Sequence, residues 1–269
     1  MLQEQTVPRA TFELLKKFLN IRLCNMKIFF ITTFVFITSL AVAQPCSYKD
    51  LEQTIASFYT KIKPCNLSIA KMDFTPVLLY KETKFLGAIG IHKKRLVVQF
   101  TSIKKDNTQP SLYQVEGWTR VAKNTRKFRG TIVINTLKTL LNTEKNNFKE
   151  EGIAEGDFLF DEYENLPATG IFKGKVLLCW AISNKGNLEY NDFYEGADPY
   201  FNNAFIGTWT SKQTQKTQQV SWAHLRVPCS GDLDIGAGEF IPNKKYLKYG
   251  WDEFINEMKA QYPGYAPYN

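Results

Sequence analysis

Residues 128–135, FRGTIVIN, decide the fold class of this chain. The segment is rich in β-branched residues, which favour strands, and its glycine follows an aromatic residue by two positions. Eight further runs, with period-two alternation or short apolar stretches, predict strands in the same way. Together the predicted strands are residues 77–80, 85–91, 96–101, 113–121, 128–135, 157–163, 170–183, 204–211 and 220–227.

The tripeptide Phe-x-Gly occurs four times, beginning at Phe85, Phe128, Phe172 and Phe205. Glycine within a strand marks a bulge, a bend or a close approach of two backbones, and such sites let a sheet curl and close. Many short strands separated by turn signals are typical of a sandwich or barrel. We therefore expect a mainly β fold, an antiparallel β-barrel or strongly curled sheet.

Helices are expected at both ends of the β region. In residues 48–62, Leu51, Ile55, Phe58 and Ile62 recur at helical spacing behind Ser47, a residue type that caps helices. An apolar stripe also predicts a helix over residues 250–260. No low-complexity linker divides the chain, so residues 44–269 are predicted to form a single β-rich domain. The polar stretch 142–151 reads as a long loop.

Residues 205–209, Phe-Ile-Gly-Thr-Trp, resemble the Gly-x-Trp strand of the lipocalins and fatty-acid-binding proteins, the calycin family. The resemblance implies a calycin-like barrel with an apolar ligand pocket, in which Trp209 caps the floor beneath a basic side chain, here Arg226. In calycins the motif opens the first strand, whereas here it comes late. Residues 202–251 also resemble the C-terminal part of uncharacterised bacterial secreted proteins, a family with no known activity.

The N-terminal region predicts export. Met26 and Lys27 begin a pattern in which an apolar run, residues 28–40, precedes the small-x-small sequence of residues 41–43. We interpret residues 26–43 as a cleavable bacterial signal peptide, and residues 1–25 as an upstream extension from a mis-assigned start. The run is too short for a membrane-spanning helix, so no stable membrane span is expected in the mature chain. The predicted location is the periplasm or the cell exterior.

The charge of the chain narrows its partners. Its formal net charge is +8, with lysines scattered among acidic residues. A nucleic-acid-binding face is denser in basic residues than this, so no nucleic acid partner is expected. The expected partners are a small apolar molecule, a glycan or another extracytoplasmic protein.

Four cysteines follow the predicted cleavage site, Cys46, Cys65, Cys179 and Cys229. In an exported chain they permit two disulfides with three connectivities. A direct bond between Cys46 and Cys65 is disfavoured because the predicted helix would hold them about 22 Å apart. Cys179 lies in an apolar strand, where a buried free thiol is the alternative.

The segment from Ser230 to Phe240 is rich in acidic residues and glycine. Asp232, Asp234 and Glu239 resemble the ligands of a calcium loop, but a glycine occupies an expected ligand position. The favoured interpretation leaves both aspartates facing solvent. We therefore expect no cofactor, and calcium is the only candidate. The same carboxylates are the candidates for a glycan-active hydrolase.

Three hypotheses for the function follow. The favoured one is a secreted, non-enzymatic binding protein with aromatics around a barrel mouth, whose candidate ligand-binding residues are Trp118, Trp209 and Arg226. The alternatives are an interaction or inhibitor protein without a pocket, and the hydrolase. His92 and His224 carry no recognisable nucleophile–base pattern, so no catalytic residue is assigned.

Overall fold

The structure is a computed structural model that describes residues 47–141 and 148–268. The chain divides into two units, residues 1–45 and 46–269, and only the second is described. The predicted extension 1–25, the signal peptide 26–43 and Cys46 lie outside the described residues. Among the described residues, no helix has the length and apolar character needed to cross a membrane.

Strands make up 46% of the structure and helices 17%, which confirms the prediction of a mainly β fold. The strands are antiparallel and follow one another along the chain with short connections. The elements in chain order are α2 (Tyr48–Ala56), β1 (Lys61–Pro64), η1 (Ile69–Lys71), α3 (Thr75–Leu78), β2 (Phe85–Ile89), β3 (Lys94–Lys105), β4 (Leu112–Val121), β5 (Asn124–Leu141), β6 (Phe148–Asp161), β7 (Gly170–Ser183), β8 (Leu188–Tyr190), β9 (Asn202–Ser211), β10 (Thr217–His224), η2 (Gly231–Leu233), η3 (Lys244–Tyr249) and α4 (Trp251–Gln261).

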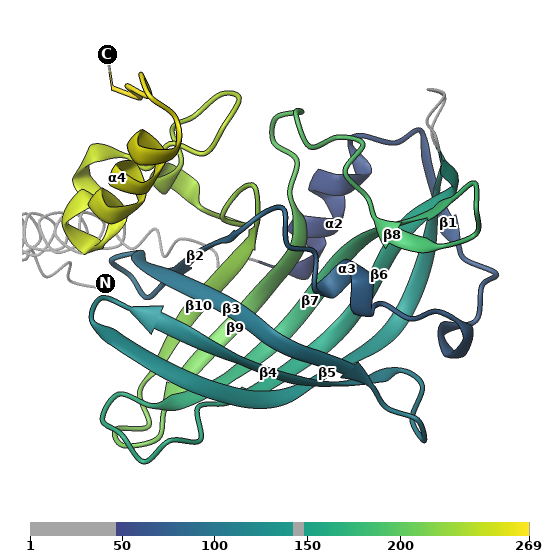
Figure 1. The fold of residues 1–269 in the computed structure, drawn as a ribbon, viewed down its shortest axis with the longest axis horizontal. Coiled ribbons are helices and arrows are strands. Elements are labelled where there is room, and N and C mark those ends of the chain that lie inside the picture. The colour runs from purple at the N-terminus through teal and green to yellow at the C-terminus, as the bar shows by residue number, and fades with distance from the viewer. Residues whose placement is uncertain (1–46, 142–147, 269) are drawn as a thin grey trace, which may run out of the picture. The chain divides into compact units, whose positions relative to one another are not determined.

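The sheet curls into a ring (Figure 1). Its path runs from β2 through β3, β4, β5, β6, β7 and β9 to β10, and β10 pairs with β2 to close it. The outline is irregular because β5, β6 and β7 extend beyond their neighbours at one end. There β1 pairs with the end of β5 and β8 with the end of β7. The curled sheet was predicted, and the pairings show how it curls.

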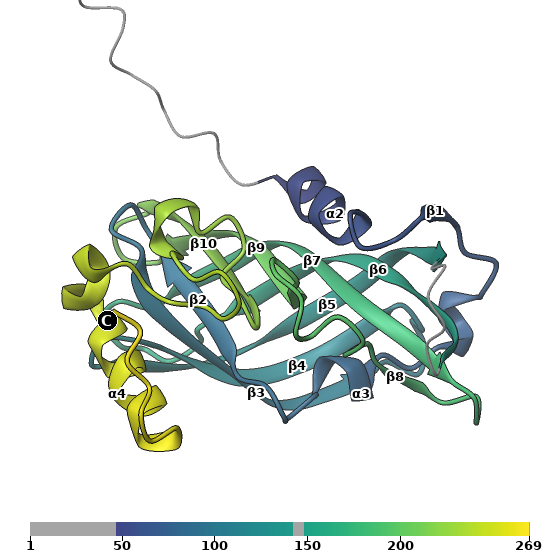
Figure 2. The same ribbon diagram turned by 90° about the horizontal axis from the view of Figure 1, so that it is seen from above.

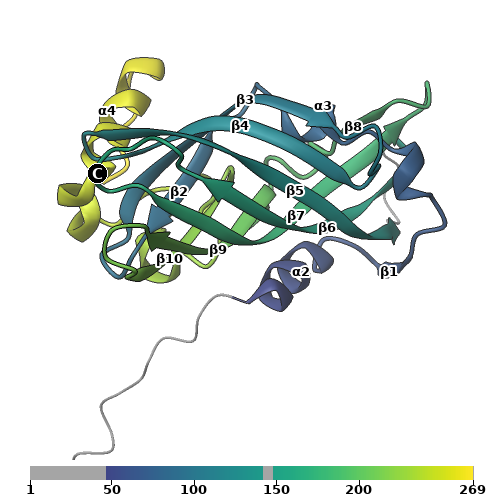
Figure 3. The ribbon, with the colours of Figure 1, turned by 90° about the horizontal axis from the view of Figure 1, so that it is seen from below.

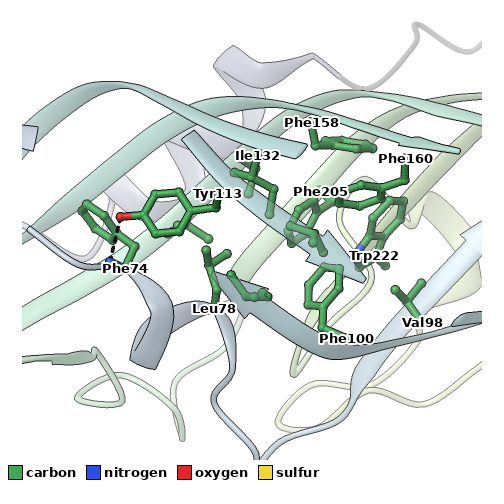
Figure 4. Close-up of a cluster of buried hydrophobic side chains, with 14 of the residues drawn as sticks. Phe74, Leu78, Val98, Phe100, Tyr113, Ile132, Phe158, Phe160, Phe205 and Trp222 are labelled. Carbon is green, nitrogen blue, oxygen red and sulfur yellow. Dashed lines mark hydrogen bonds between the residues drawn. The ribbon is translucent and has the colours of Figure 1, made fainter. Parts of the chain in front are cut away.

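Aromatic side chains fill the interior of the ring (Figure 4). Trp222 lies parallel to Phe205 with ring centroids 5.0 Å apart, and Phe128 lies 4.9 Å from Phe160. These four rings are at most 1% exposed. The middle of the ring is therefore a packed core, because close-packed rings at these spacings leave little free volume between them.

The Phe-x-Gly glycines allow strands to approach closely. Gly174 and Gly207 face each other across β7 and β9, and a Cβ added to either would lie within 2.7 Å of the other's Cα. The irregularities in strand register lie at other places in the sheet, for example between Phe100 and Ser102. Of the three roles predicted for these glycines, the structure thus shows close backbone approach.

Two helices cover different parts of the sheet's outer surface (Figures 2 and 3). Helix α2 places Leu51 and Ile55 against β6, β7 and β9. Helix α4 places Trp251, Phe254 and Ile255 in a cluster beside β2. The predicted C-terminal helix is confirmed almost to the residue.

Three predicted elements differ from the structure. Residues 148–151, expected to belong to a long loop over residues 142–151, are the start of strand β6. Helix α2 ends at Ala56, because the chain turns at Ser57 and then enters β1, so residues 57–62 are not helical. Residues 77–80 form no strand, since Pro76 lies in the first turn of the short helix α3. Proline favours the first turn of a helix, and the apolar run that follows is buried as part of α3.

The cysteines agree with the alternative predicted for Cys179 and depart from the possibility of two disulfides. Cys65 is a half-buried free thiol and Cys179 a buried one, so neither forms the disulfide that the sequence permitted. Burial raises the pKa of the Cys179 thiol to about 12. Cys229 is not a free thiol, and no disulfide joins two cysteines within residues 47–141 and 148–268.

Candidate functional site

One end of the ring is closed by residues 65–80, here called the cap segment. Its buried side chains face the same core as the strands. The segment turns inward where Asp73 Oδ1 accepts a hydrogen bond of 3.0 Å from Thr75 N, just before α3. The side chains that it buries, each at most 7% exposed, are Met72, Phe74, Val77 and Leu78.

Tyr113, on β4, holds the cap segment through its backbone. Its hydroxyl accepts a hydrogen bond of 3.0 Å from Phe74 N and donates one of 3.3 Å to Met72 O (Figure 4). Burial raises the pKa of Tyr113 to about 12, so the hydroxyl keeps its proton at neutral pH and can serve both partners.

Two further side chains of the sheet bind backbone carbonyls of the cap segment. Lys105, at the end of β3, donates to Ala70 O at 2.9 Å and to Met72 O at 2.5 Å. Asn203, on β9, donates to Val77 O at 2.8 Å. The cap segment is therefore held mainly by its backbone and by apolar burial.

A pocket of about 660 Å³ lies between the cap segment and the hairpin that joins β7 to β8. This volume is in the range of small-molecule sites, about 300–1,000 Å³. The hairpin turns at Gly186, whose φ of +86° suits glycine. The described residues that line the pocket are Leu67, Ser68, Lys71, Met72, Asp73, Pro76, Ile182, Gly186, Asn187 and Leu188.

The polar residues of this pocket lie at its exposed side. Lys71 and Asp73 are exposed, whereas Met72 between them is buried. Asp73 already accepts hydrogen bonds from the backbone and hydroxyl of Thr75. Among the described residues, no carboxylate forms an ion pair with Lys71. Of the lining residues that the structure describes, five are thus apolar and four polar, and the polar ones include a cation without an ion pair at the pocket mouth.

The opposite end of the ring, called the Glu162 end, is closed by a buried carboxylate. Glu162 is 3% exposed and accepts hydrogen bonds from Thr119 Oγ1 at 2.6 Å, Gly170 N at 2.7 Å and Trp209 Nε1 at 3.0 Å. Burial raises the pKa of Glu162, and these hydrogen bonds oppose that shift in part. Trp209, the predicted ligand residue, therefore pairs with an acid.

The three predicted ligand-binding residues lie apart. Trp118 is half-buried and faces outward from β4, since its neighbours Gly117 and Thr119 are buried. Trp209 packs inside the ring. Arg226 follows the end of β10 and forms ion pairs with Asp198 at 2.8 Å and Asp234 at 2.5 Å. The structure does not bring them together in one site.

Arg226 also occupies the centre of the loop predicted as a calcium candidate. Its guanidinium donates to the carbonyl oxygens of Ala237 and Gly238, each at 3.1 Å. Asp232 instead binds Lys245 and Tyr246, and Glu239 is exposed. Within the described part of the chain, no group of three potential metal ligands occurs. An arginine thus holds the carbonyls of this loop.

His224 is buried rather than poised for catalysis. It is 1% exposed, its Nδ1 lies 3.3 Å from Tyr190 Oη, and its ring centroid lies 4.2 Å from that of Phe85. Burial lowers the pKa of His224 to about 3, so the imidazole is neutral at physiological pH. Its surroundings are those of a core residue.

Compared with family models, curated proteins and solved structures, the chain shows no match. The site therefore has to be argued from its own geometry. Sequence reasoning did not find the pocket, because residues 67–76, which supply one wall, lie outside every predicted strand and helix. The other wall lies at the end of the predicted strand 170–183 and in the residues that follow it.

Proposed function

We propose that this chain is a non-enzymatic binding protein of the periplasm or the cell exterior. Its ligand is a small, mainly apolar molecule held in the pocket between the cap segment and β8. The observation that carries the proposal is the pocket itself, because its volume and its five apolar lining residues, with polar residues at the exposed side, suit such a molecule. The export signal predicted at residues 26–43 gives the proposed location.

The ligand site differs from the one that a calycin-like barrel implies. In the resemblance, the ligand would occupy the interior above Trp209. Here Phe205 and Trp222 stack in the middle of the ring, and Phe158 and Phe160 pack around them. A ligand in the interior would have to displace that core, whereas the pocket at the cap segment is already formed.

An apolar molecule suits the pocket better than a glycan. Among the described lining residues none is aromatic, and sugars are commonly held by aromatic faces that stack on their C–H surfaces. The wall residues Leu67, Ile182 and Leu188 are aliphatic instead. Lys71 at the mouth supports a ligand that carries one anionic or hydrogen-bonding group beside its apolar part.

A pocket-free interaction protein is the second candidate, and one observation favours it. Leu159 on β6 and Ile171 on β7 are 48% and 38% exposed, and their strands pair so that the two lie diagonally on the outer face. Exposed neighbouring apolar residues can mark a protein contact. A photo-crosslinking residue at position 159 would then give one discrete adduct in producing cells, and one at the exposed position 261, at the end of α4, would give none.

We do not propose a hydrolase. Asp232 is bound by Lys245 and Asp234 by Arg226, so both aspartates serve the local structure. A glycosidase needs an acid and a base or nucleophile facing a common cleft. Glu239 is exposed, and none of these carboxylates lines the pocket.

Native mass spectrometry of gently purified protein tests the proposal. We expect a retained small molecule in addition to the mass of the chain, and the same spectrum reports the mature N-terminus. In a second measurement, a dansyl-labelled fatty acid serves as a probe, and Ser68→Trp should fill the pocket from its exposed side. Thr125→Trp, at the Glu162 end, is the matched control.

The expected result is that Ser68→Trp weakens probe binding about tenfold or more, while Thr125→Trp leaves it unchanged. Loss of probe binding in both variants, or in neither, would contradict the pocket as the site. A wild-type protein that retains no molecule and binds no probe would favour the interaction protein instead.

A further inference from the structure

A basic surface lies at the end of the ring opposite the pocket, where the turn between β2 and β3 meets η3. The turn carries Ile91 and His92, and η3 carries Lys244, Lys245 and Lys248. Ile91 is 89% exposed, far more than any other exposed large apolar residue among those described. We call Ile91, Lys94, Lys244, Lys245 and Lys248 the lysine–isoleucine patch.

Two sets of contacts hold the turn against η3. The imidazole of His92 stacks on the Tyr249 ring with centroids 5.2 Å apart and an interplanar angle of 19°, and Lys248 Nζ lies 5.2 Å from the same ring. On the other side, Lys93 donates to Ser230 O. Trp251 Nε1 donates to Lys93 O at 2.7 Å. The patch is thus a built surface, in which Ile91 and Lys248 each precede one of the two stacked rings in the sequence.

Most of the charge of this surface is available to a partner. Lys94, Lys244, Lys245 and Lys248 are exposed. Within residues 47–141 and 148–268, only Lys245 of these forms an ion pair, with Asp232. Helix α4 has three acidic residues, of which Glu253 and Glu257 are engaged by Arg95, and Asp252 is exposed beside the lysines. The patch therefore has a net positive charge around one exposed apolar side chain.

We propose that the lysine–isoleucine patch docks this protein on an anionic lipid bilayer surface. The lysines contact the headgroups, and Ile91 enters the boundary between headgroups and acyl chains. Charge complementarity selects an anionic partner, because each lysine near such a surface contributes about 1 kcal/mol. Ile91 selects a bilayer over a polysaccharide, because an exposed aliphatic side chain gains nothing from a chain of charged sugars.

This docking goes beyond the binding of a ligand and uses none of the residues of the pocket. Figures 1 and 2 show α4 at one end of the sheet and α3 and β8 toward the other, so docking through the patch leaves the cap segment away from the bilayer. The two proposals can therefore fail separately.

Flotation with lipid vesicles tests the docking. Vesicles of phosphatidylcholine containing phosphatidylglycerol should bind the protein, and vesicles of phosphatidylcholine alone should not. Ile91→Ser should weaken binding about tenfold. Lys244→Gln with Lys248→Gln should weaken it more than tenfold at low salt, at about fivefold for each lysine, and added salt should reduce that difference.

The controls match each change in chemistry but lie elsewhere on the sheet. Leu159→Ser removes another exposed aliphatic residue, and Lys63→Gln with Lys173→Gln removes two exposed lysines. Both should float as the wild type does. Ile91 lies exposed in a turn, and unchanged circular dichroism of each variant checks that it folds.

Three results would overturn the proposal. The first is no binding to the anionic vesicles. The second is equal loss in the patch variants and their controls. The third is binding to dextran sulfate that needs the lysines while Ile91→Ser leaves vesicle binding unchanged, which would assign the patch to an anionic polysaccharide.

Discussion

The two ends of the ring are closed in different ways. At the Glu162 end, one buried carboxylate gathers donors from Thr119 on β4, Gly170 on β7 and Trp209 on β9. At the cap end, a separate stretch of chain lies across the opening, and Lys105 and Asn203 bind its backbone carbonyls. The first closure joins strands to one another, and the second joins the strands to an additional segment.

This difference indicates where a ligand can enter. Opening the Glu162 end would separate strands and leave a buried carboxylate without its donors, which is costly. Moving the cap segment would break contacts to that segment alone, and the sheet pairings would remain. Segments with few anchoring contacts open at lower free energy than the sheet beneath them. The pocket lies beside the segment that can move more easily.

The largest expected effect is at the Glu162 end. Trp209→Ala removes a large side chain from the core and the donor of one hydrogen bond to Glu162. We expect the free energy of unfolding to fall by about 3–5 kcal/mol in urea denaturation. Trp118→Ala, on the outer face, is the control, and its effect should be clearly smaller. Equal losses would show that Trp209 has no special part in closing this end.

Glu162→Gln tests the same closure through pH. Because burial raises the pKa of Glu162, the folded state binds more protons than the unfolded state between the ordinary carboxyl pKa and the raised one. The wild-type free energy of unfolding therefore falls as pH rises through this window. Gln cannot ionise, and its NH₂ group takes the place of one carboxyl oxygen, either the one that accepts from Thr119 or the one that accepts from Gly170 and Trp209. The variant should therefore be about 1 kcal/mol less stable near pH 4.

The difference in stability between wild type and Glu162→Gln should narrow as pH rises above the ordinary carboxyl value. Chemical denaturation across this pH range measures it. Glu116→Gln removes an exposed carboxyl from the outer face of β4 and should show no such trend. A difference that stays constant with pH would mean that Glu162 titrates as an ordinary carboxyl.

Tyr113→Phe should release the cap end while leaving the ring intact. The variant leaves Phe74 N without its acceptor, so the free energy of unfolding should fall by about 1 kcal/mol. Hydrogen exchange should become faster at the amides of residues 69–79 and stay unchanged in β6 and β7. Tyr163→Phe, at an exposed position, is the control. Uniformly faster exchange would show that the cap segment is part of the same cooperative unit as the sheet.

The alternation of apolar and polar residues along the strands predicted most of the fold. In β4, the buried residues alternate with exposed or half-buried ones from Tyr113 to Thr119, so the period-two pattern predicted it almost completely. The inner Phe of each Phe-x-Gly packs in or against the core, as expected. The strand predictions that were wrong were those made from short apolar runs outside the sheet. Residues 77–80 have the composition of a strand, but their burial comes from packing as a cap.

The candidate site was less predictable, for a physical reason. Gly-x-Trp was identified correctly as a strand with a buried tryptophan, but its partner turned out to be Glu162 and not Arg226. Partner choice depends on which strand ends meet across the ring, and this register is not visible in one segment. The pocket likewise requires residues 67–76 and 182–188 to meet, which depends on the closure of the whole sheet.

The smallest expected effect concerns the carboxylates at the C-terminal loop and bears on whether a ligand binds away from the cap end. Asp232→Asn combined with Glu239→Gln should leave the melting temperature unchanged, with calcium or with a chelator present. Both residues are exposed, and the loop carbonyls are held by Arg226 rather than by a metal. Asp234→Asn is the matched control and should lower the melting temperature, because it removes one of the two carboxylates that pair with the largely buried guanidinium of Arg226 and leaves only Asp198. If calcium stabilised the wild type and this gain vanished in the double variant, the loop would be a metal site and the cap end would not be the sole ligand site of this fold.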